Sequence, residues 1–313
     1  MRLIRQYLHL KMAEKLLCKT QLAINEPGEF TAENVLSVEE AIQLAGDFPW
    51  EEERKNVKIG LTTASITMKS ENGCFLKLAL SYNGKFVLYY FDQSQLYKKI
   101  IPTLQASFPD IILFFDTGEK GPDFKKENTI FQHPEIHFQT RDFRYHYQKK
   151  FIYYTDWYTR IILPVWVAYI IYVLVELVPA KGAVSGLFIL LFLLLMFPLF
   201  GGLNLLLCIR YYRVFKDLNI VLSRGAGSFQ YGTANKLETI QKSDIADITV
   251  LRNNSSRCPW NNYSLTRIGL YDNRELDIPS TLIDSYTIIE KFPLIKVEQR
   301  FDFAPFPKRK AIN

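Results

Sequence analysis

Two long apolar runs dominate the pattern of hydrophobic and polar positions along the chain. The first extends from Ile161 to Pro179 with Glu176 as its single ionisable residue, and the second extends from Gly182 to Ile209 without a charge. A helix rises 1.5 Å per residue, so about 20 apolar residues cross a hydrocarbon core about 30 Å thick. A soluble protein would have to bury such helices on every side. The runs therefore predict a transmembrane hairpin over residues 161–209.

Basic residues on the flanks of the two runs predict an orientation. Arginines and lysines gather before the first run and after the second, whereas the connecting loop contributes only Lys181. Positive residues stay on the cytoplasmic side, so we expect both termini inside and a short loop outside. Basic and aromatic side chains at the helix ends suit the headgroup region. The predicted membrane-interface residues are Arg144, Lys149, Lys150, Trp157, Tyr158, Arg160, Arg210, Arg213 and Lys216.

Glu176 is the one ionisable residue inside the predicted hairpin, and such residues are the usual mark of a transport path. It lies about one helical turn from the outer end of the first run, where its carboxylate can reach the interface. Two helices without a polar face do not form a pore. We therefore interpret Glu176 as an interface residue, with transport in a larger complex as the alternative.

The chain before the hairpin predicts an α+β domain over residues 31–140. Ser37 and Glu40 have the spacing of a capping box and predict a helix start. The dipeptides Asn72-Gly73 and Asn83-Gly84 separate runs rich in apolar and aromatic residues, which predicts a three-stranded antiparallel meander with type I′ turns. Leucine, isoleucine and phenylalanine at four-residue spacing predict a helix over residues 94–108, and PDIILFFDTG (109–118) predicts a buried strand.

The segments on either side of this domain carry weaker patterns. Residues 1–30 are expected to form a poorly packed lead-in, with an amphipathic surface helix as the alternative and Met12 as a second possible start. No unbroken apolar stretch or cleavage site indicates a secretory signal. Residues 141–160 mix aromatic and basic residues and predict a juxtamembrane segment. A single-stranded nucleic acid could bind such a mixture, but the segment runs directly into an apolar helix, so we expect no nucleic acid partner.

The chain after the hairpin predicts a mainly-β domain over residues 210–300 and a basic tail over residues 301–313. Short strands are expected around Gly225 and Gly227, over Ile245–Leu251, on both sides of Asp272-Asn273 and in LIKVEQRF. Thr281 and Asp284 predict the cap of an amphipathic helix. The predicted fold class is thus a membrane protein with a two-helix transmembrane hairpin between an N-terminal α+β domain and a C-terminal mainly-β domain.

The segments IQKSDIADI and RELDIPS, a polar entry into a strand and a late strand leading to a helix, carry a family resemblance. Residues 210–300 resemble the bacterial pleckstrin-homology-like (PH-like) domains that follow paired transmembrane helices. The resemblance implies a small β-barrel closed by a C-terminal helix, which acts in binding or assembly without a catalytic centre. It also implies a location in the bacterial inner membrane.

No motif for catalysis, a metal or a cofactor stands out. Four scattered cysteines, among them Cys208 within the second run, form no CxxC pair, which fits reducing, cytoplasmic domains. His133 and His137 are separated by PEI, whose proline favours an extended segment over a helical metal site. The run Glu51–Glu53 favours a solvated helix end over a pair of catalytic carboxylates. We therefore expect no catalytic residue, no metal and no cofactor.

These patterns favour a non-enzymatic integral membrane protein that presents two cytoplasmic domains to protein partners or lipid headgroups. Two alternatives remain open. The chain could be an immunity protein that neutralises a membrane-associated toxin, since small α+β domains without chemistry are common in such proteins. It could also be a membrane-anchored enzyme that uses Glu51–Glu53, His133 or His137.

Overall fold

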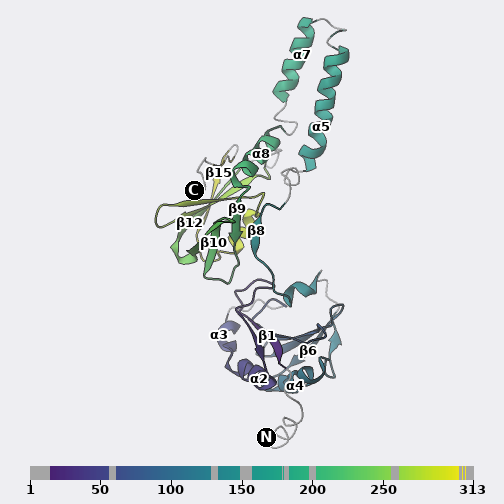
Figure 1. Ribbon diagram of the computed structural model, residues 1–313, viewed down its shortest axis with the longest axis vertical. Helices are drawn as coiled ribbons and strands as arrows, with labels where there is room; N and C mark the ends of the chain where they lie inside the picture. The colour runs from purple at the N-terminus through teal and green to yellow at the C-terminus, as the bar shows by residue number, and fades with distance from the viewer. Residues whose placement is uncertain are drawn as a thin grey trace, which may run out of the picture. The chain divides into compact units, whose positions relative to one another are not determined.

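The computed structural model describes residues 15–55, 61–127, 133–148, 157–177, 179, 183–196, 202–254, 261–302, 305 and 307. Contacts between Cα atoms divide the chain into two compact units. The first comprises Met1–Asp142 with Ser223–Ala226, and the second comprises Phe143–Leu222 with Gly227–Asn313. Figure 1 shows the helices and strands of each unit, and each unit is described by itself.

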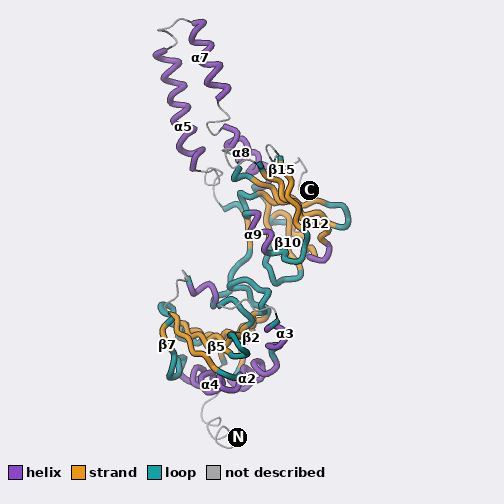
Figure 2. Tube along the Cα trace, turned by 180° about the vertical axis from the view of Figure 1, so that it is seen from behind, coloured by secondary structure: helices purple, strands orange, loops and turns teal. Residues whose placement is uncertain are grey.

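The first unit is built on one antiparallel sheet with the strand order β2-β1-β3-β4-β5-β6-β7. Helices α2 and α4 cover one face, and the short helix η2 lies on the opposite side of the sheet (Figures 1 and 2). The strands are β1 Leu16–Gln21, β2 Ala32–Leu36, β3 Ser65–Lys69, β4 Phe75–Leu80, β5 Phe86–Phe91, β6 Leu96–Ile101 and β7 Lys125–Lys126. The helices are α2 Val38–Asp47, α3 Trp50–Arg54, η1 Leu104–Ser107, α4 Phe108–Thr117 and η2 Pro134–His137.

Two local predictions for this unit are confirmed. Ser37 caps α2, and the Glu40 side chain accepts a hydrogen bond from the Ser37 backbone, which completes the capping box. Strands β3, β4 and β5 form the antiparallel meander. Asn83 and Gly84 both have positive φ, at 54° and 74°, as a type I′ turn requires. The Asn72-Gly73 turn differs, because only Gly73 has positive φ there.

Two other predictions are wrong, and they are neighbours in the chain. The helix expected over residues 94–108 is strand β6 followed by the single turn η1, and the strand expected over residues 109–118 is helix α4. The segment of α4 carries helix signals, namely a proline in the first turn and Gly118 in the left-handed conformation as C-cap. Ile111, Phe114 and Phe115 have helical spacing and all face the core.

The lead-in expected over residues 1–30 also differs from the structure where residues are described. Strand β1 pairs with both β2 and β3, so it is an inner strand of the sheet. Leu16 and Cys18 are buried in the core below α2 and α4. The run LLCKTQ does not alternate between apolar and polar residues, so it carries no clear strand signal, and both faces of β1 contribute buried side chains. Residues 1–14 lie outside the described residues.

The second unit contains two four-stranded sheets. Their orders are β11-β10-β9-β8 and β14-β13-β12-β15, and β15 runs parallel to β12. The strands are β8 Arg144–His146, β9 Leu218–Val221, β10 Ser228–Thr233, β11 Lys236–Gln241, β12 Ile245–Arg252, β13 Ser264–Leu270, β14 Glu275–Pro279 and β15 Val297–Phe301. The helical segments are α5 Trp157–Tyr172, η4 Val173–Leu177, α7 Ala183–Met196, α8 Leu203–Phe215, η6 Lys242–Asp244 and α9 Ser285–Glu290. The strands expected after the hairpin are thus confirmed.

The structure corrects the predicted cap of the last helix in one detail. Asp284 alone is the N-cap of α9, and its carboxylate accepts hydrogen bonds from the backbone N–H groups of Tyr286 and Thr287. The Thr281 hydroxyl instead bonds the hydroxyl of Tyr147 at 2.5 Å. The helix therefore starts three residues later than a Thr281 cap would place it.

Helix α8 contradicts the predicted extent of the second membrane span. Leu207, Cys208, Tyr211 and Phe215 are buried in one hydrophobic cluster with side chains from both sheets of the second unit. The Tyr211 hydroxyl also donates a hydrogen bond to the backbone oxygen of Pro305 at 2.5 Å. Residues 203–209 therefore belong to the core of the β domain, and Cys208 does not lie in a hydrophobic span.

Candidate functional site

The most conspicuous surface of the second unit is an apolar helical hairpin. Helices α5 and α7 pack side by side through a small cluster that contains Trp166, Val173 and Leu193 (Figure 1). Leu163, Ile170 and Ile189 pack partly buried against this cluster, and most of the other described large apolar side chains of the two helices are exposed. The exposed ones are Ile161, Val165, Val167, Tyr169, Ile171, Tyr172, Leu174, Val175, Val184, Leu187, Phe188, Leu191, Phe192 and Leu195.

The length of these helices can be compared with a bilayer. Residues 157–177 form a continuous helical segment that extends about 30 Å at 1.5 Å per residue. Among the described residues, one stretch, Thr159–Glu176, is long and apolar enough to cross a membrane, and 17% of it is buried. By itself this criterion is weak evidence, because a core helix of a soluble protein can meet it. A core helix, however, is mostly buried, whereas this one is mostly exposed.

The structure distributes the predicted interface residues over several elements. Arg144 lies on β8, and Trp157, Tyr158 and Arg160 lie in the first turn of α5. Arg210 lies in the second half of α8, Arg213 lies in its last turn, and Lys216 is its C-cap residue. The side chains of Arg144, Arg160, Arg213 and Lys216 are exposed. Lys149 and Lys150 fall outside the described residues, as do the side chains of Trp157 and Tyr158.

The aromatic residues just before α5 have a different environment from the one expected. Tyr145 and Tyr147 pack against the hydrophobic core of the second unit, and the Tyr147 ring lies 5.5 Å from the ring of Tyr212. The Nζ atom of Lys291 lies 5.2 Å from the ring centre of Phe143 and 5.3 Å from that of Tyr145. Residues 143–147 are therefore part of the β domain and not of a lipid-facing belt.

Glu176 lies in η4, a π-helical segment at the end of α5, and its side chain is exposed. A π-helical segment widens the helix by one residue and often marks a functional position. No described side chain forms an ion pair with Glu176 in the structure. The carboxylate thus faces outward from an otherwise apolar helix.

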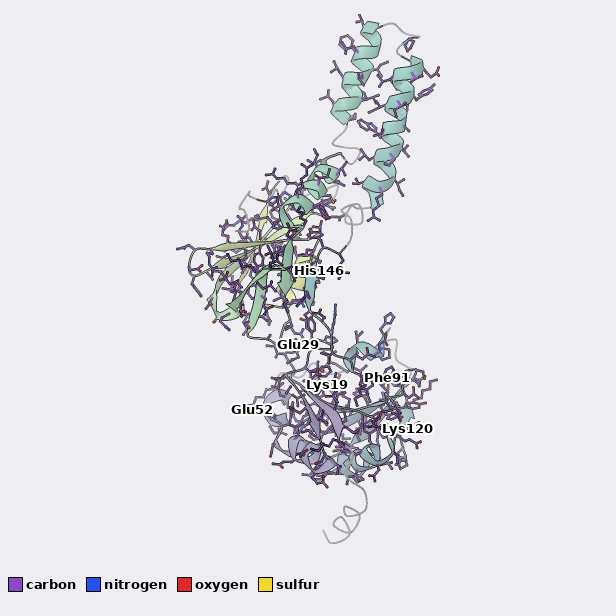
Figure 3. All side chains as sticks on the ribbon, viewed as in Figure 1. Lys19, Glu29, Glu52, Phe91, Lys120 and His146 are labelled. Atoms are coloured by element: carbon purple, nitrogen blue, oxygen red, sulfur yellow. The ribbon has the colours of Figure 1, made fainter. Side chains whose placement is uncertain are left out.

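The residues considered for catalysis are not arranged as an active site among the described residues. Glu51 and Glu52 line a cavity of about 520 Å³ in the first unit, but no histidine, cysteine or serine lines it with them. Glu53 accepts a hydrogen bond from the backbone N–H of Ala23 at 2.6 Å. In Figure 3, Glu52 lies at the outer edge of the first unit.

His133 and His137 lie in different environments and have different hydrogen-bond partners. The segment between them forms the single turn η2 and is not extended as predicted. His133 is exposed and bonds Glu135 at 3.0 Å, whereas His137 is buried and bonds the Thr62 hydroxyl at 2.9 Å. Within the described part of the chain, no group of three histidine, cysteine or carboxylate side chains could hold a metal ion.

Comparison with known proteins identifies the second unit. The family model of the PH domain matches residues 142–291. The chain therefore contains a PH-like domain, as the resemblance predicts, but this domain begins at β8, before the apolar helices. The matched range includes α5, α7 and α8, which lie in the chain between the paired strands β8 and β9. No curated protein and no solved structure matches the chain.

Proposed function

We propose that the chain is a non-enzymatic integral membrane protein of the bacterial inner membrane that presents two cytoplasmic binding units beside the bilayer. In this proposal α5 and α7 cross the membrane, the loop between them lies outside the cytoplasm, and both chain ends lie inside. The partners are the lipid bilayer and a protein that binds at the membrane. No cofactor takes part.

One observation carries the proposal, namely the outward-facing apolar side chains of α5 and α7. More than half of the large hydrophobic side chains exposed among the described residues belong to α5, to η4 at its end, and to α7. Soluble monomers rarely expose a contiguous apolar patch of more than a few hundred Å². Lipid would cover this surface at no cost in free energy, and the basic residues Arg160, Arg213 and Lys216 would meet the anionic headgroups.

Charge substitutions on α7 test this proposal in the full-length chain. We expect Phe188→Lys combined with Leu195→Lys to remove the protein from the membrane fraction, because each lysine costs about 3 kcal/mol in the bilayer centre. Both side chains are exposed, at 70% and 73%. The measurement is sedimentation with cell membranes before and after extraction at high pH, read with an antibody to the protein.

The second unit supplies a matched control outside the hairpin. Tyr271 and Leu294 are exposed to a similar degree, at 73% and 93%, but lie outside the hairpin. Tyr271→Lys combined with Leu294→Lys should leave membrane association unchanged. The proposal fails if the wild-type protein is found in the soluble fraction, or if both double variants behave alike.

A further inference from the structure

One face of the sheet in the first unit is polar although it is buried. Lys19 and Gln21 of β1, Ser65 and Thr67 of β3, and Lys77 of β4 are each at most 5% exposed. We call these five residues the polar bed. Strand register pairs Thr67 with both Lys19 and Lys77, so the three side chains form a row across the sheet. The opposite face carries leucine, isoleucine and methionine below α2 and α4.

Residues 133–142 cover the polar bed, and we call this segment the strap. Polar contacts dominate its attachment. The Lys77 ammonium donates to the backbone oxygen of His137 at 3.1 Å and to Oε1 of Gln21 at 2.9 Å. Lys19 donates to the Thr140 hydroxyl at 2.5 Å, and the Arg141 N–H donates to the Gly28 oxygen at 2.9 Å. Figure 3 labels Lys19 and Phe91 on this side of the sheet.

The strap has one large apolar anchor. Phe138 is fully buried, and its ring stacks on Phe91 at 5.2 Å with an interplanar angle of 13°. The same ring lies 5.7 Å from Phe75. Apart from Phe138 and His137, the residues of the strap are half-buried or exposed. Removing the strap would therefore open a small apolar cluster and the polar bed, while the large core on the other face stays intact.

Among the described residues, no carboxylate forms an ion pair with Lys77. Glu33 of β2 pairs with Lys19, Glu127 pairs with Lys98 of β6, and Glu135 of the strap pairs with His133. The other charged groups on this side are Lys69 of β3 and, in the strap, Arg141 and Asp142. The hydroxyl groups of Thr63 and Thr67 are buried without a hydrogen-bond partner among the described residues. The charge of a protonated Lys77 is therefore met in the closed state by two neutral oxygens and the Phe138 ring, 5.8 Å away, but by no opposite charge.

The burial of Lys77 and His137 under the strap lowers the pKa of both groups. Burial lowers the pKa of Lys77 from 10.5 to about 7. Burial, together with the charge of Lys77, lowers the pKa of His137 from 6.5 to about 4. Both groups therefore bind protons more weakly while the strap is closed than they would in water.

We propose that the strap is a proton-sensitive cover that detaches from the sheet as one unit when Lys77 and His137 become protonated, which uncovers the polar bed. Detachment restores water to both groups, so the open state binds the protons more tightly than the closed state. By linkage, the opening equilibrium shifts toward the open state as the pH falls from 10.5 to 7 through Lys77. It shifts again as the pH falls from 6.5 to 4 through His137.

Hydrogen exchange of the full-length protein in mild detergent, read by mass spectrometry, tests this proposal. The reporters are the strap amides, above all that of Arg141, which donates to the Gly28 oxygen outside the strap, whereas Phe138 and Gln139 donate to Glu135 within it. After correction for the intrinsic exchange rate, we expect their protection to fall more than about tenfold between pH 8 and pH 5. Amides of β3 and β4 should keep their protection, which shows that the sheet stays folded.

A pair of histidine variants provides the control. His137→Phe should remove most of the response below pH 6.5, whereas His133→Phe, which changes the exposed histidine of the same strap, should leave it intact. The proposal is overturned if strap and sheet lose protection together, if the strap is equally protected at pH 8 and pH 5, or if the two variants respond alike.

Discussion

Replacing Leu207 by alanine is expected to destabilise the PH-like domain by about 2–5 kcal/mol, whereas the same change at the neighbouring Leu206 should have an effect of less than about 1 kcal/mol. The two leucines are adjacent in α8, but Leu207 is fully buried in the core between the two sheets and Leu206 is 51% exposed. Truncating a buried leucine loses its burial and leaves a cavity, whereas truncating an exposed leucine does neither.

The measurement is the midpoint of thermal unfolding of the full-length protein in mild detergent, followed by tryptophan fluorescence. Leu207→Ala should lower the midpoint by several degrees, and Leu206→Ala should leave it close to that of the wild type. Equal shifts for the two variants would contradict the placement of α8 in the domain core. Such a result would return residues 203–209 to the predicted membrane span.

Replacing Lys77 by methionine is expected to abolish a large part of the pH dependence of stability of the first unit. The folded-state pKa of Lys77 is about 7, below the value of 10.5 in the unfolded chain. Between these values the unfolded chain binds a proton that the folded state does not, so the free energy of unfolding rises with pH. The free energy of unfolding is therefore lower below pH 7 than above pH 10.5, and the difference due to Lys77 amounts to roughly 3–5 kcal/mol.

Denaturant unfolding at pH 7 and pH 10 measures this effect. The wild-type free energy of unfolding should rise more between these pH values than that of Lys77→Met. Cys18 acts in the opposite direction, because burial raises the pKa of its thiol to about 12, but it is present in both proteins. Lys69→Met, at an exposed position of the adjacent strand, should retain the wild-type pH dependence. If Lys77→Met retained the full wild-type pH dependence, burial would not lower the pKa of Lys77 in the folded protein, which would contradict this prediction.

Local signals predicted much of the secondary structure in the first unit, and their failures have a physical reason. The capping box at Ser37 and the Asn83-Gly84 turn are defined by residues a few positions apart, so the sequence contains all the information that they need. PDIILFFDTG is a short apolar run that fits a buried strand or a buried helix equally well by hydrophobicity. Its first-turn proline and its C-terminal glycine favour the helix that the structure contains.

The polar bed could not be predicted from the sequence. Lys77 is the one polar residue in FLKLAL, and a lysine in such a strand ordinarily lies on a face in water. The strap that buries it comes about 60 residues later in the chain, as the separation of Lys77 and His137 shows. Register and cover are long-range features, and a single sequence does not contain them.

The N-terminal boundary of the PH-like domain could not be predicted from the sequence for a similar reason. Strand β8 lies before the apolar helices and pairs with β9 after them, so 70 or more residues separate partners such as Tyr145 and Ile220. The sequence pattern predicted the strands after α8 but placed residues 141–160 in a lipid-facing segment. The family match from residue 142 and the pairing of β8 with β9 correct that boundary.

The central claim, that α5 and α7 cross a membrane with both units on its cytoplasmic side, is tested most directly by protease protection in intact bacterial spheroplasts. The account predicts that added protease leaves the first unit and the two sheets of the second unit undigested, with any cleavage confined to the loop that contains Lys181. After lysis of the spheroplasts, both units should be digested, while a periplasmic marker is digested in both conditions. Digestion of either unit in intact spheroplasts would contradict the account.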